Sequence, residues 1–446
     1  MMQKKQHAQP VAGALLAFTI PLILSGLLQQ MFNWVDAFIV GNIEGETALA
    51  GIGATTSLYN LFVTVITGFT SGLSVLSAQQ YGMGEERKIT GLLSSYAILL
   101  GALFAAVAAA GILFADKILL LLNTPAEIFA DAERYLRLLL PGIPFLAVYN
   151  TYSAILRGIG NSRAPFLAVL VSSGVNVGLD LVFVAVLDFG AAGAAAATAI
   201  AQAAMTVFII VYAVRRYPAL LFSFSRGALG RLPLKSGLRF GLPPAVQSGV
   251  SSVGNVFLQQ FMNGFGEQTV AAITTSYRVD TVIFLPITNL GSGIATLVAQ
   301  DTGAGRKERA KSIFKTGTVL MAAVSLGLTA LVLLLGEHLI AAFGLTAASV
   351  SIGKSFFHSI AGFYIVYGIS MAIRGYLEGT GDMVFSGITG ILSLGVRISC
   401  SYAFRPVFGN MVVAYAEAFS WFFLLLLFFL RYAGRQRKQV QGLSIR

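Results

Sequence analysis

The stretch SAQQYGMG, Ser77–Gly84, returns in altered form as VAQDTGAG, Val298–Gly305, in the other half of the chain. The same separation in residue number relates LRGIGN, Leu156–Asn161, to LEGTGD, Leu377–Asp382. A Gly-Glu dipeptide repeats at this spacing as well, at Gly45–Glu46 and Gly266–Glu267. Chance does not readily produce one separation at three distant places. The sequence therefore predicts an internal duplication, with two halves of similar length and architecture.

The composition predicts an all-α polytopic membrane protein. Of the 446 residues, 56% are hydrophobic and only 11% are charged, whereas soluble domains contain about 25% charged residues. Apolar windows of about 20 residues, the length that crosses a bilayer as a helix, are separated by glycine, proline and charge clusters. Twelve spans are predicted, at residues 14–40, 46–80, 89–115, 132–156, 164–187, 190–214, 238–263, 269–300, 312–335, 347–374, 384–404 and 410–430.

The composition also argues against several other classes of protein. A single cysteine, Cys400, excludes a disulfide framework, and the three histidines are too scattered to suggest a metal cluster. The apolar N-terminal stretch contains Pro21 and Asp36 and has no small-x-small cleavage site, so it is interpreted as the first span rather than as a signal peptide. We expect no organic cofactor. The net charge of +11 is attributed to membrane orientation, not to nucleic-acid binding.

The basic residues set the predicted orientation. With twelve spans both termini lie on one side, and the loops on that side contain 23 of the 30 lysines and arginines. The positive-inside rule makes this side cytoplasmic. The predicted organisation is an N-lobe at 12–214, a basic cytoplasmic linker at 215–237, a C-lobe at 238–431 and a cytoplasmic tail at 432–446. Six spans per half give a parallel repeat, an arrangement common in transporters.

Two stripes of polar residues lie inside predicted spans, where contact with lipid would be unfavourable. Gln29, Asn33 and Asp36 are spaced i, i+4, i+7 in the first span and share one helix face. In the fifth span, Asn176 and Asp180 are one turn apart. Both stripes fall in the outer half of the membrane. An acidic residue inside a span is costly and usually functional, so the stripes predict a polar site in the N-terminal half.

The chemistry of the two stripes suits a small cation. Carboxylate and amide oxygens are ligands for a hard cation such as Na⁺, for which Asp36, Asp180 and Asn176 are the candidate ligands. Burial and a second nearby carboxylate also favour a protonated carboxyl group, which makes proton binding equally feasible. The structural alternative is that each aspartate caps a helix end or satisfies backbone groups, and that Asn176 joins neighbouring helices.

The second half lacks this acidic pair, because the repeat places Arg397 opposite Asn176 and Ser401 opposite Asp180. Its charged residues within spans are interpreted first as members of structural ion pairs and second as coupling groups: Arg278, Asp280, Arg397 and Glu417. Arg278 and Asp280 are two residues apart and cannot face each other on a straight helix. If the second half contributes to substrate binding, the candidates, with Gln29 and Asn33 from the first half, are Asn255, Gln259 and Tyr277.

Pro21 lies inside the first span, where proline removes one backbone hydrogen bond and favours a bend. A bend that differs between transport states would make Pro21 a hinge, and a static bend is the structural alternative. The glycine-rich segments YGMG, RGIG and DTGAGRK lack the GxxxxGK[ST] spacing of a phosphate-binding loop. They are interpreted as tight cytoplasmic turns.

At this point the sequence resembles the multidrug and toxic compound extrusion (MATE) transporters, in particular their bacterial branch. The resemblance covers about residues 12–430. It rests on IPLILSGLLQQMFNWVDAFIVGNIEGETALAGIG, SAQQYGMGEERK, LRGIGNSRAP, NVGLDLVFV, GLPPAVQSG and VAQDTGAGRKERA. It implies a V-shaped fold of twelve transmembrane helices in two pseudo-symmetric six-helix lobes. It also implies a location in the bacterial cytoplasmic (inner) membrane.

The resemblance assigns roles to individual residues. Asp36 and Asp180 match the paired acids of the family's N-lobe cation site, and Asn176 matches the amide one turn before the second acid. Thr198 resembles a threonine near that site, and Pro21 matches the bend of the first helix. The acids that one family branch places in the seventh and tenth helices are not matched, because Asn255 occupies the seventh and no acid lies between Phe356 and Arg374. This departure favours coupling in the N-lobe.

These observations predict an antiporter, not an enzyme. It would export amphipathic organic cations or drugs in exchange for H⁺ or Na⁺ by alternating access, as a monomer in the lipid bilayer. The alternative is a flippase for lipid-linked oligosaccharides or other lipid precursors of the same superfamily. Such a protein needs a cationic cavity, for which the spans offer only Arg278 and Arg397. A channel would show rings of like charge, and an intramembrane enzyme would need a nucleophile and a base.

Overall fold

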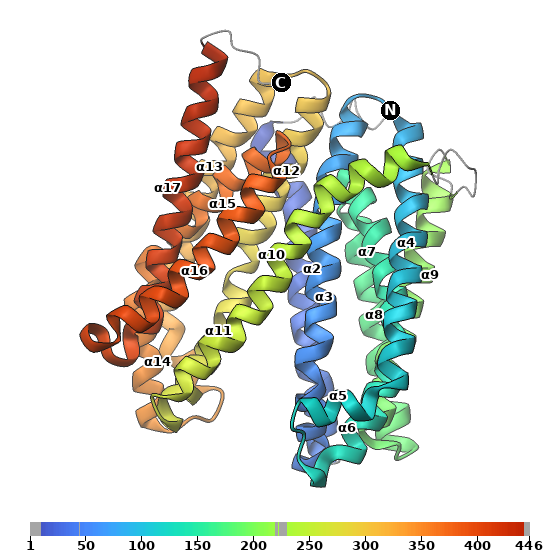
Figure 1. Cartoon of the computed structure of the whole chain (residues 1–446), viewed down its shortest axis with the longest axis vertical. Helices are drawn as coiled ribbons and strands as arrows, with labels where there is room; N and C mark the ends of the chain where they lie inside the picture. Colours follow the sequence, from blue (N-terminus) through green and yellow to red (C-terminus); the bar gives the residue numbers. More distant parts are fainter. Residues whose placement is uncertain (1–9, 44, 219–221, 223–229, 441–446) are drawn as a thin grey trace. The chain divides into compact units, whose positions relative to one another are not determined.

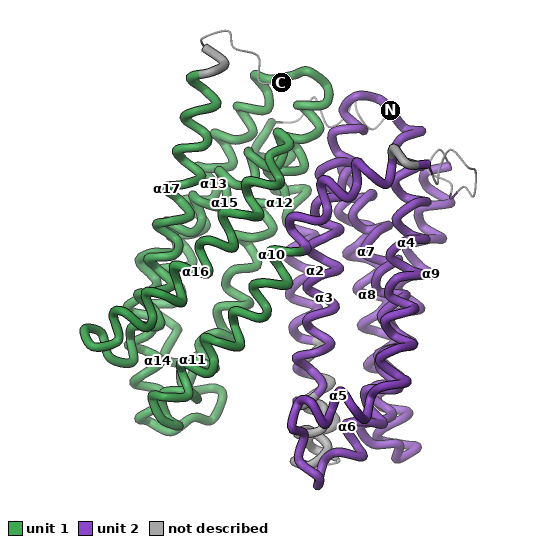
Figure 2. The backbone as a smooth tube through the Cα atoms, viewed as in Figure 1, with its two compact units in different colours: residues 1–19, 246–446 green, residues 20–245 purple. Residues whose placement is uncertain are grey.

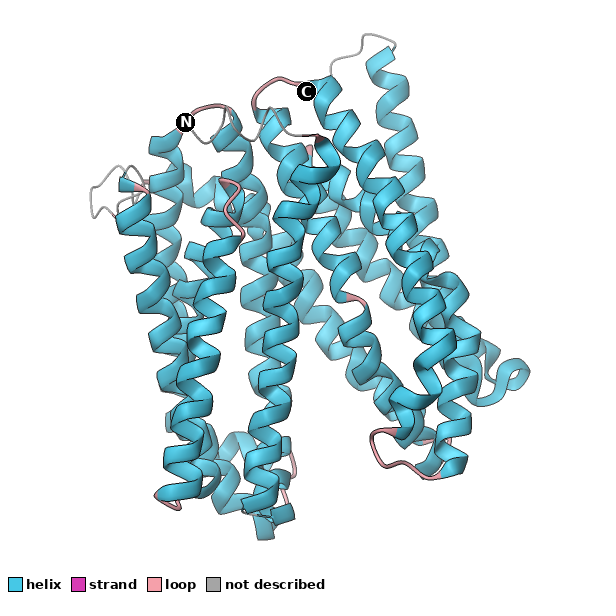
Figure 3. Cartoon of the chain, turned by 180° about the vertical axis from the view of Figure 1, so that it is seen from behind, coloured by secondary structure: helices cyan, strands magenta, loops and turns pink. Residues whose placement is uncertain are grey.

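The computed structural model describes residues 10–43, 45–218, 222 and 230–440. Inside the helices, the side chains of residues 32, 33, 35–43, 45–52, 54, 231, 232 and 438–440 also lie outside this description. Helices and short connecting turns make up the described chain, in which no strand occurs (Figure 3).

The first half contains α2 to α9 (Figure 1). Its elements are α2 (Val11–Ile43), α3 (Gly45–Gly82), α4 (Glu86–Leu113), α5 (Ala115–Leu121), α6 (Ala126–Leu139), α7 (Gly142–Gly158), α8 (Arg163–Asp180), the π-helix η1 (Leu181–Val186) and α9 (Gly190–Arg216). The second half contains α10 (Arg231–Asn263), α11 (Glu267–Ile283), α12 (Leu285–Gly303), α13 (Lys307–Ala341), α14 (Ala347–Ile360), η3 (Ala361–Phe363), α15 (Tyr364–Gly379), α16 (Met383–Phe408), η4 (Gly409–Met411) and α17 (Val412–Val440).

The helices agree with the predicted twelve spans. In the described chain nine segments are long and apolar enough to cross a membrane, and the bent pair α6 and α7 makes a tenth. The segment Met383–Arg437 contains both α16 and α17, so counting these separately gives eleven. The predicted span at 238–263 falls on α10, which is not among these segments and begins with basic turns that contain Lys235 and Arg239. The predicted class, an all-α polytopic membrane protein, is confirmed.

Three of the predicted spans are broken helices. The span at 132–156 is divided into α6 and α7, which meet at 41° beside Pro141. The span at 269–300 is divided at Phe284, just before Pro286 at the start of α12. A proline lacks the N–H that a continuous helix requires and clashes with the preceding turn. A short 3₁₀ segment, Ala361–Phe363, separates α14 from α15 without a proline.

The chain forms two compact units (Figure 2). The N-terminal unit contains residues 20–245, and the C-terminal unit contains residues up to Thr19 together with those from Val246 onward. The boundary falls inside α2, just before Pro21. Each unit has its own apolar core, which includes Tyr96 in the N-terminal unit and Tyr364 in the C-terminal unit. Leu15, in the first turns of α2, is fully buried in the core of the C-terminal unit.

The backbone repeats the predicted duplication. Gly84 and Gly305, which correspond in the repeat, have φ of 75° and 73°. Gly160 and Gly381, at the same separation, have φ of 93° and 94°. Such left-handed positions favour glycine because a side chain there is strained. In each case the residue that follows donates its N–H to a carbonyl five residues back, which ends the helix in the same way in both halves.

Helix packing repeats at the same spacing. In the N-terminal unit, a Cβ at Gly158 on α7 would stand 1.8 Å from Ser77 Oγ and 2.8 Å from the carbonyl oxygen of Ser74 on α3. In the C-terminal unit, a Cβ at Gly379 on α15 would stand 2.7 Å from the Ala295 carbonyl oxygen on α12. The two glycines therefore let equivalent helix pairs approach closely.

Candidate functional site

Asp180 lies at the junction of α8 and the π-helix η1 and is fully buried. A π-helix widens the helical turn, and such turns are frequent at functional sites. The widened turn is shown by its hydrogen bonds, since the N–H of Leu187 donates to the carbonyl of Val182, 2.9 Å away. The carboxyl group is thus held inside the N-terminal unit at a local irregularity of the helix.

One predicted partner, Asn176, contacts Asp180, and Thr198 contacts Asn176 in turn. When the Asn176 amide is oriented to satisfy both of its polar atoms, its nitrogen donates to Asp180 Oδ2 at 2.8 Å. The amide oxygen then accepts from Thr198 Oγ1 at 3.3 Å and from the Thr198 backbone N–H at 3.1 Å. Asn176 is buried, and Thr198 comes from the neighbouring helix α9. The structure therefore brings Asp180, Asn176 and Thr198 into one hydrogen-bonded group between α8 and α9.

The other residues predicted for the N-terminal site are placed differently. Gln29 is exposed on α2. The side chains of Asn33 and Asp36 lie outside the described residues. Pro21 lies inside α2, which continues through it, and its carbonyl accepts a hydrogen bond of 2.9 Å from Ser25 Oγ. Serine side chains that bond backbone carbonyls in this way are found near helix bends.

Three polar residues of this region were not predicted. Gln202 is buried on α9, one turn beyond Thr198, and its amide donates to the hydroxyl of Tyr59 on α3. Thr206, a further turn along, donates to the carbonyl oxygen of Phe145 at 2.8 Å. The sequence carried a signal for Gln202, because Thr198, Gln202 and Thr206 are spaced i, i+4, i+8 in an otherwise apolar helix.

The C-terminal unit holds a separate buried polar cluster. Arg397 on α16 contacts Glu417 on α17, with 2.8 Å between Arg397 Nη2 and Glu417 Oε2, as predicted for a structural ion pair. The same guanidinium group donates to the Tyr277 hydroxyl on α11 at 2.8 Å. Asp280, also on α11, accepts a hydrogen bond of 2.6 Å from the Tyr364 hydroxyl on α15. The hydrogen-bond partner of Asp280 is therefore a hydroxyl group and not Arg278.

The remaining predicted residues of the second half lie nearer the surface. Arg278 is exposed and lines an open groove of about 490 Å³ together with Glu267 and Thr274. Asn255 and Gln259 are exposed on α10, and the Gln259 amide donates to Asn263 Oδ1 at 3.1 Å. Tyr277, the third substrate candidate, is half-buried and already engaged by Arg397.

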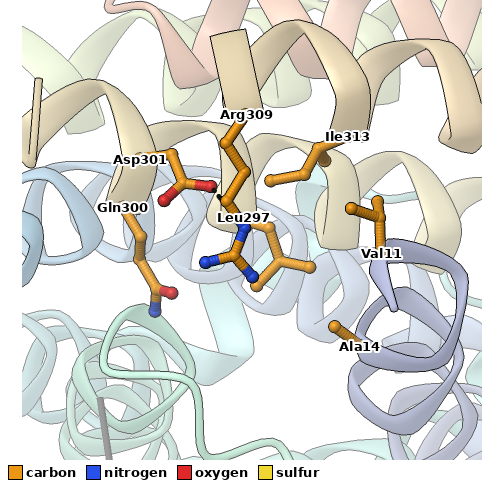
Figure 4. A pocket seen from close by; sticks show the side chains of 7 residues that line it. All are labelled: Val11, Ala14, Leu297, Gln300, Asp301, Arg309 and Ile313. Atoms are coloured by element: carbon orange, nitrogen blue, oxygen red, sulfur yellow. Dashed lines mark ion pairs between the residues drawn. The ribbon is translucent and has the colours of Figure 1, made fainter. Parts of the chain in front are cut away.

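A small pocket lies at the end of α12 (Figure 4). Asp301 lines it and pairs with Arg306 at 3.3 Å and with Arg309 at 3.5 Å. The volume of the pocket is about 10 Å³, which suits a single water molecule and no organic substrate. The pocket is lined by Val11, Ala14, Leu297, Gln300, Asp301, Arg309 and Ile313.

Comparison with known proteins gives one consistent family. The family model MatE matches the chain twice, over residues 21–182 and 243–403, which agrees with the internal repeat. The chain is 26% identical over 427 residues to "Probable multidrug resistance protein YpnP" of Bacillus subtilis (strain 168), covering 95% of each chain. It is 23% identical over 401 residues to "Multidrug export protein MepA" of Staphylococcus aureus (strain NCTC 8325 / PS 47), covering 90% of this chain and 88% of the relative.

The solved structures show the same fold. An outward-facing multidrug resistance MATE family transporter of the MOP superfamily matches with a TM-score of 0.90 over 99% of this chain and 98% of its own, at 21% identity. A crystal structure of MATE in complex with MaL6 also matches with a TM-score of 0.90, at 22% identity, over 99% of each chain.

Proposed function

The chain belongs to the MatE family, and from that premise we propose that it exports amphipathic organic cations in exchange for H⁺ or Na⁺ by alternating access. The coupling site is the group formed by Asp180, Asn176 and Thr198, completed by Asp36. The observation that carries the proposal is the fully buried carboxyl group of Asp180, held by the Asn176 amide at 2.8 Å. The names of the relatives, multidrug resistance and multidrug export proteins, support the choice of substrate.

The arrangement explains how such a site can exchange a cation. Burying an ionised carboxylate in a medium of low dielectric constant is costly. A proton removes the charge, and a bound Na⁺ would compensate it with the carboxylate oxygens as ligands. A residue whose charge depends on occupancy can favour opposite-facing states in its two forms, and this difference in affinity is what lets an ion gradient drive transport.

We propose that the two six-helix lobes, residues 12–214 and 238–431, are the moving parts, joined by the linker at 215–237. Both termini are cytoplasmic in this proposal, and the protein lies in the bacterial cytoplasmic membrane. Pro21 is the proposed hinge, and its position just after the unit boundary supports that assignment. Gln29, Asn33, Asn255 and Gln259 remain the candidates for contacts with substrate.

The flippase alternative has less support. It depends on Arg278 and Arg397 as a cationic surface for a pyrophosphate group. Arg397 is paired with Glu417 at 2.8 Å, so its charge is already compensated. The relatives in Bacillus subtilis and Staphylococcus aureus carry the names of multidrug proteins.

The test is efflux of a fluorescent organic cation from everted membrane vesicles, with a pH gradient and a Na⁺ gradient imposed separately. We expect one gradient to drive efflux in the wild type, and expect Asp180→Asn and Asp36→Asn to lose that response. Asp188→Asn is the matched control, because Asp188 is exposed eight residues beyond Asp180 and its φ of 56° suits asparagine. Wild-type efflux in both site variants would refute coupling at this site.

A further inference from the structure

The C-terminal unit contains a carboxyl group whose surroundings are incomplete. Asp280 on α11 is only 3% exposed. Its Oδ1 accepts the hydrogen bond of 2.6 Å from the Tyr364 hydroxyl. Its Oδ2 is buried and has no hydrogen-bond partner among the residues that the structure describes. Buried polar atoms are nearly always paired, so this oxygen indicates a ligand that the described residues do not supply.

The charges around Asp280 do not balance if every group is ionised. Arg397 interacts electrostatically with Asp280, but its guanidinium group contacts Glu417 and Tyr277 directly. Two acids, Asp280 and Glu417, therefore share one base, which leaves one negative charge in this cluster. A single positive charge, delivered as a proton, would neutralise the cluster.

The charged side chains of α13 and α14, which pack against α11, have other partners or face outward. Glu337 and Lys354 pair with each other at 2.6 Å and are about half exposed. His358 has its Nδ1 atom 2.8 Å from the carbonyl oxygen of Lys354. His338 is exposed and interacts electrostatically with Glu337. None of these four groups compensates the charge of Asp280.

The same holds for the other helices around Asp280 within the described chain. On α12, Asp301 pairs with arginines at the far end of the helix. On α15, Arg374 pairs with Glu378 at 2.6 Å. On α11 itself, Arg278 is exposed.

The repeat shows that this acid is specific to the second half. Asp280 and Tyr59 stand at the spacing of the repeat, so the two occupy equivalent positions. In the first half, the Tyr59 hydroxyl accepts a hydrogen bond from Gln202, which makes an uncharged pair. In the second half the same position carries an acid that accepts from a tyrosine. A neutral pair was thus sufficient for packing at this position, and the acid adds a group that can titrate.

We propose that Asp280 is a proton-binding site of the second half, separate from the Asp180 group. The proton resides on Oδ2, and the Tyr364 hydroxyl donates to Oδ1 in both protonation states. When the proton leaves, that hydrogen bond stabilises the carboxylate. The site therefore accommodates both forms without a change of partner. Its use during transport rests on the proposed function, whereas proton binding itself does not.

The experiment is infrared difference spectroscopy of the purified full-length protein during a pH titration. A protonated carboxyl group gives a C=O band that an ionised one lacks. We expect Asp280→Asn to lose the intensity of one carboxyl group from the wild-type titration. Asp188→Asn should retain that band, because Asp188 is exposed and lies outside this cluster. Tyr364→Phe should shift its frequency, because the donor to Oδ1 is removed.

The outcomes separate this proposal from the proposed function. A titration in Asp280→Asn identical to that of the wild type would overturn proton binding at Asp280. A band that responds to Na⁺ at constant pH would overturn the proton as the ligand. The spectra need no transport, so a chain that fails to export the dye can still show the Asp280 band. In vesicles that do transport, Asp280→Asn should lower the number of protons moved per dye molecule while Asp188→Asn leaves it unchanged.

Discussion

Asn161 and Asp382, which correspond in the internal repeat, each tie the last helix of their own half to the turn in which they lie. Asn161 follows α7, and its amide donates to the hydroxyls of Tyr212 and Tyr217 at 3.2 and 2.9 Å. Asp382 follows α15 and accepts from Arg431 at 2.7 Å and from Arg435 at 3.1 Å, both on α17. The duplicated turn thus makes the same connection with neutral groups in one half and with charges in the other.

The ion pairs of Asp382 with Arg431 and Arg435 should make the stability of the second half sensitive to substitution and to salt. Asp382→Asn leaves two arginines without their acid, and we expect it to lower stability by about 1–2 kcal/mol, because the acid is buried while Arg431 is partly exposed. Thermal unfolding in detergent measures this. High salt should narrow the difference between variant and wild type. In the first half Asn161→Ala should show no salt dependence, and equal salt sensitivity of both variants would contradict the assignment.

The close approach of α3 and α7 can be tested at Gly158. A methyl group there would meet Ser77 Oγ at 1.8 Å and backbone at 2.8 Å, so Gly158→Ala should destabilise by about 1–3 kcal/mol through overpacking. Gly174→Ala on α8 is the matched control, since nothing lies within 4 Å of the position that its methyl group would take. The control should be neutral or slightly stabilising. The unfolding temperatures of the two variants decide the question, and equal values would contradict the packing argument.

The coupling group should show a graded response. Asp180→Asn removes the carboxylate and should abolish gradient-driven efflux, whereas Asn176→Ala removes its 2.8 Å donor and should reduce the rate by about tenfold, which corresponds to about 1.4 kcal/mol. Thr198→Val should have the smallest effect, because the Asn176 oxygen keeps its bond from the backbone N–H of residue 198. Initial efflux rates measure the severity of the three defects. A Thr198→Val defect as severe as that of Asp180→Asn would contradict the predicted order.

The Arg397–Glu417 pair should behave as a unit. Removing one partner leaves a buried charge, so Arg397→Gln and Glu417→Gln should each cost about 3–5 kcal/mol. The double variant should be more stable than the sum of the single losses predicts. A double-mutant cycle from unfolding curves measures the coupling. Strict additivity would show that the two side chains do not interact.

Much of the candidate site could be predicted from the sequence because it lies on one helix. Asn176 and Asp180 are one turn apart, so a periodicity argument places them together, and the structure gives a contact of 2.8 Å. The role of Thr198 came only from family resemblance, since it is on another helix. Tyr364 was not predicted, because a single tyrosine in an apolar span carries no pattern that names its partner. Arg397 and Glu417 were expected to form structural pairs, but the Tyr277 contact was not.

The sequence by itself determined the membrane class, the twelve spans, the duplication and the polar stripe of α8. These follow from local composition, from helical periodicity and from comparison of the chain with itself, none of which requires knowledge of distant neighbours. Only the tertiary structure decided that Asp280 bonds Tyr364 across 84 residues, that Arg397 reaches both Glu417 and Tyr277, and that α2 contributes Leu15 to the core of the C-terminal unit. The physical reason is that such contacts depend on how whole helices rotate and pack, and hydropathy fixes which segments are helical but not which faces meet.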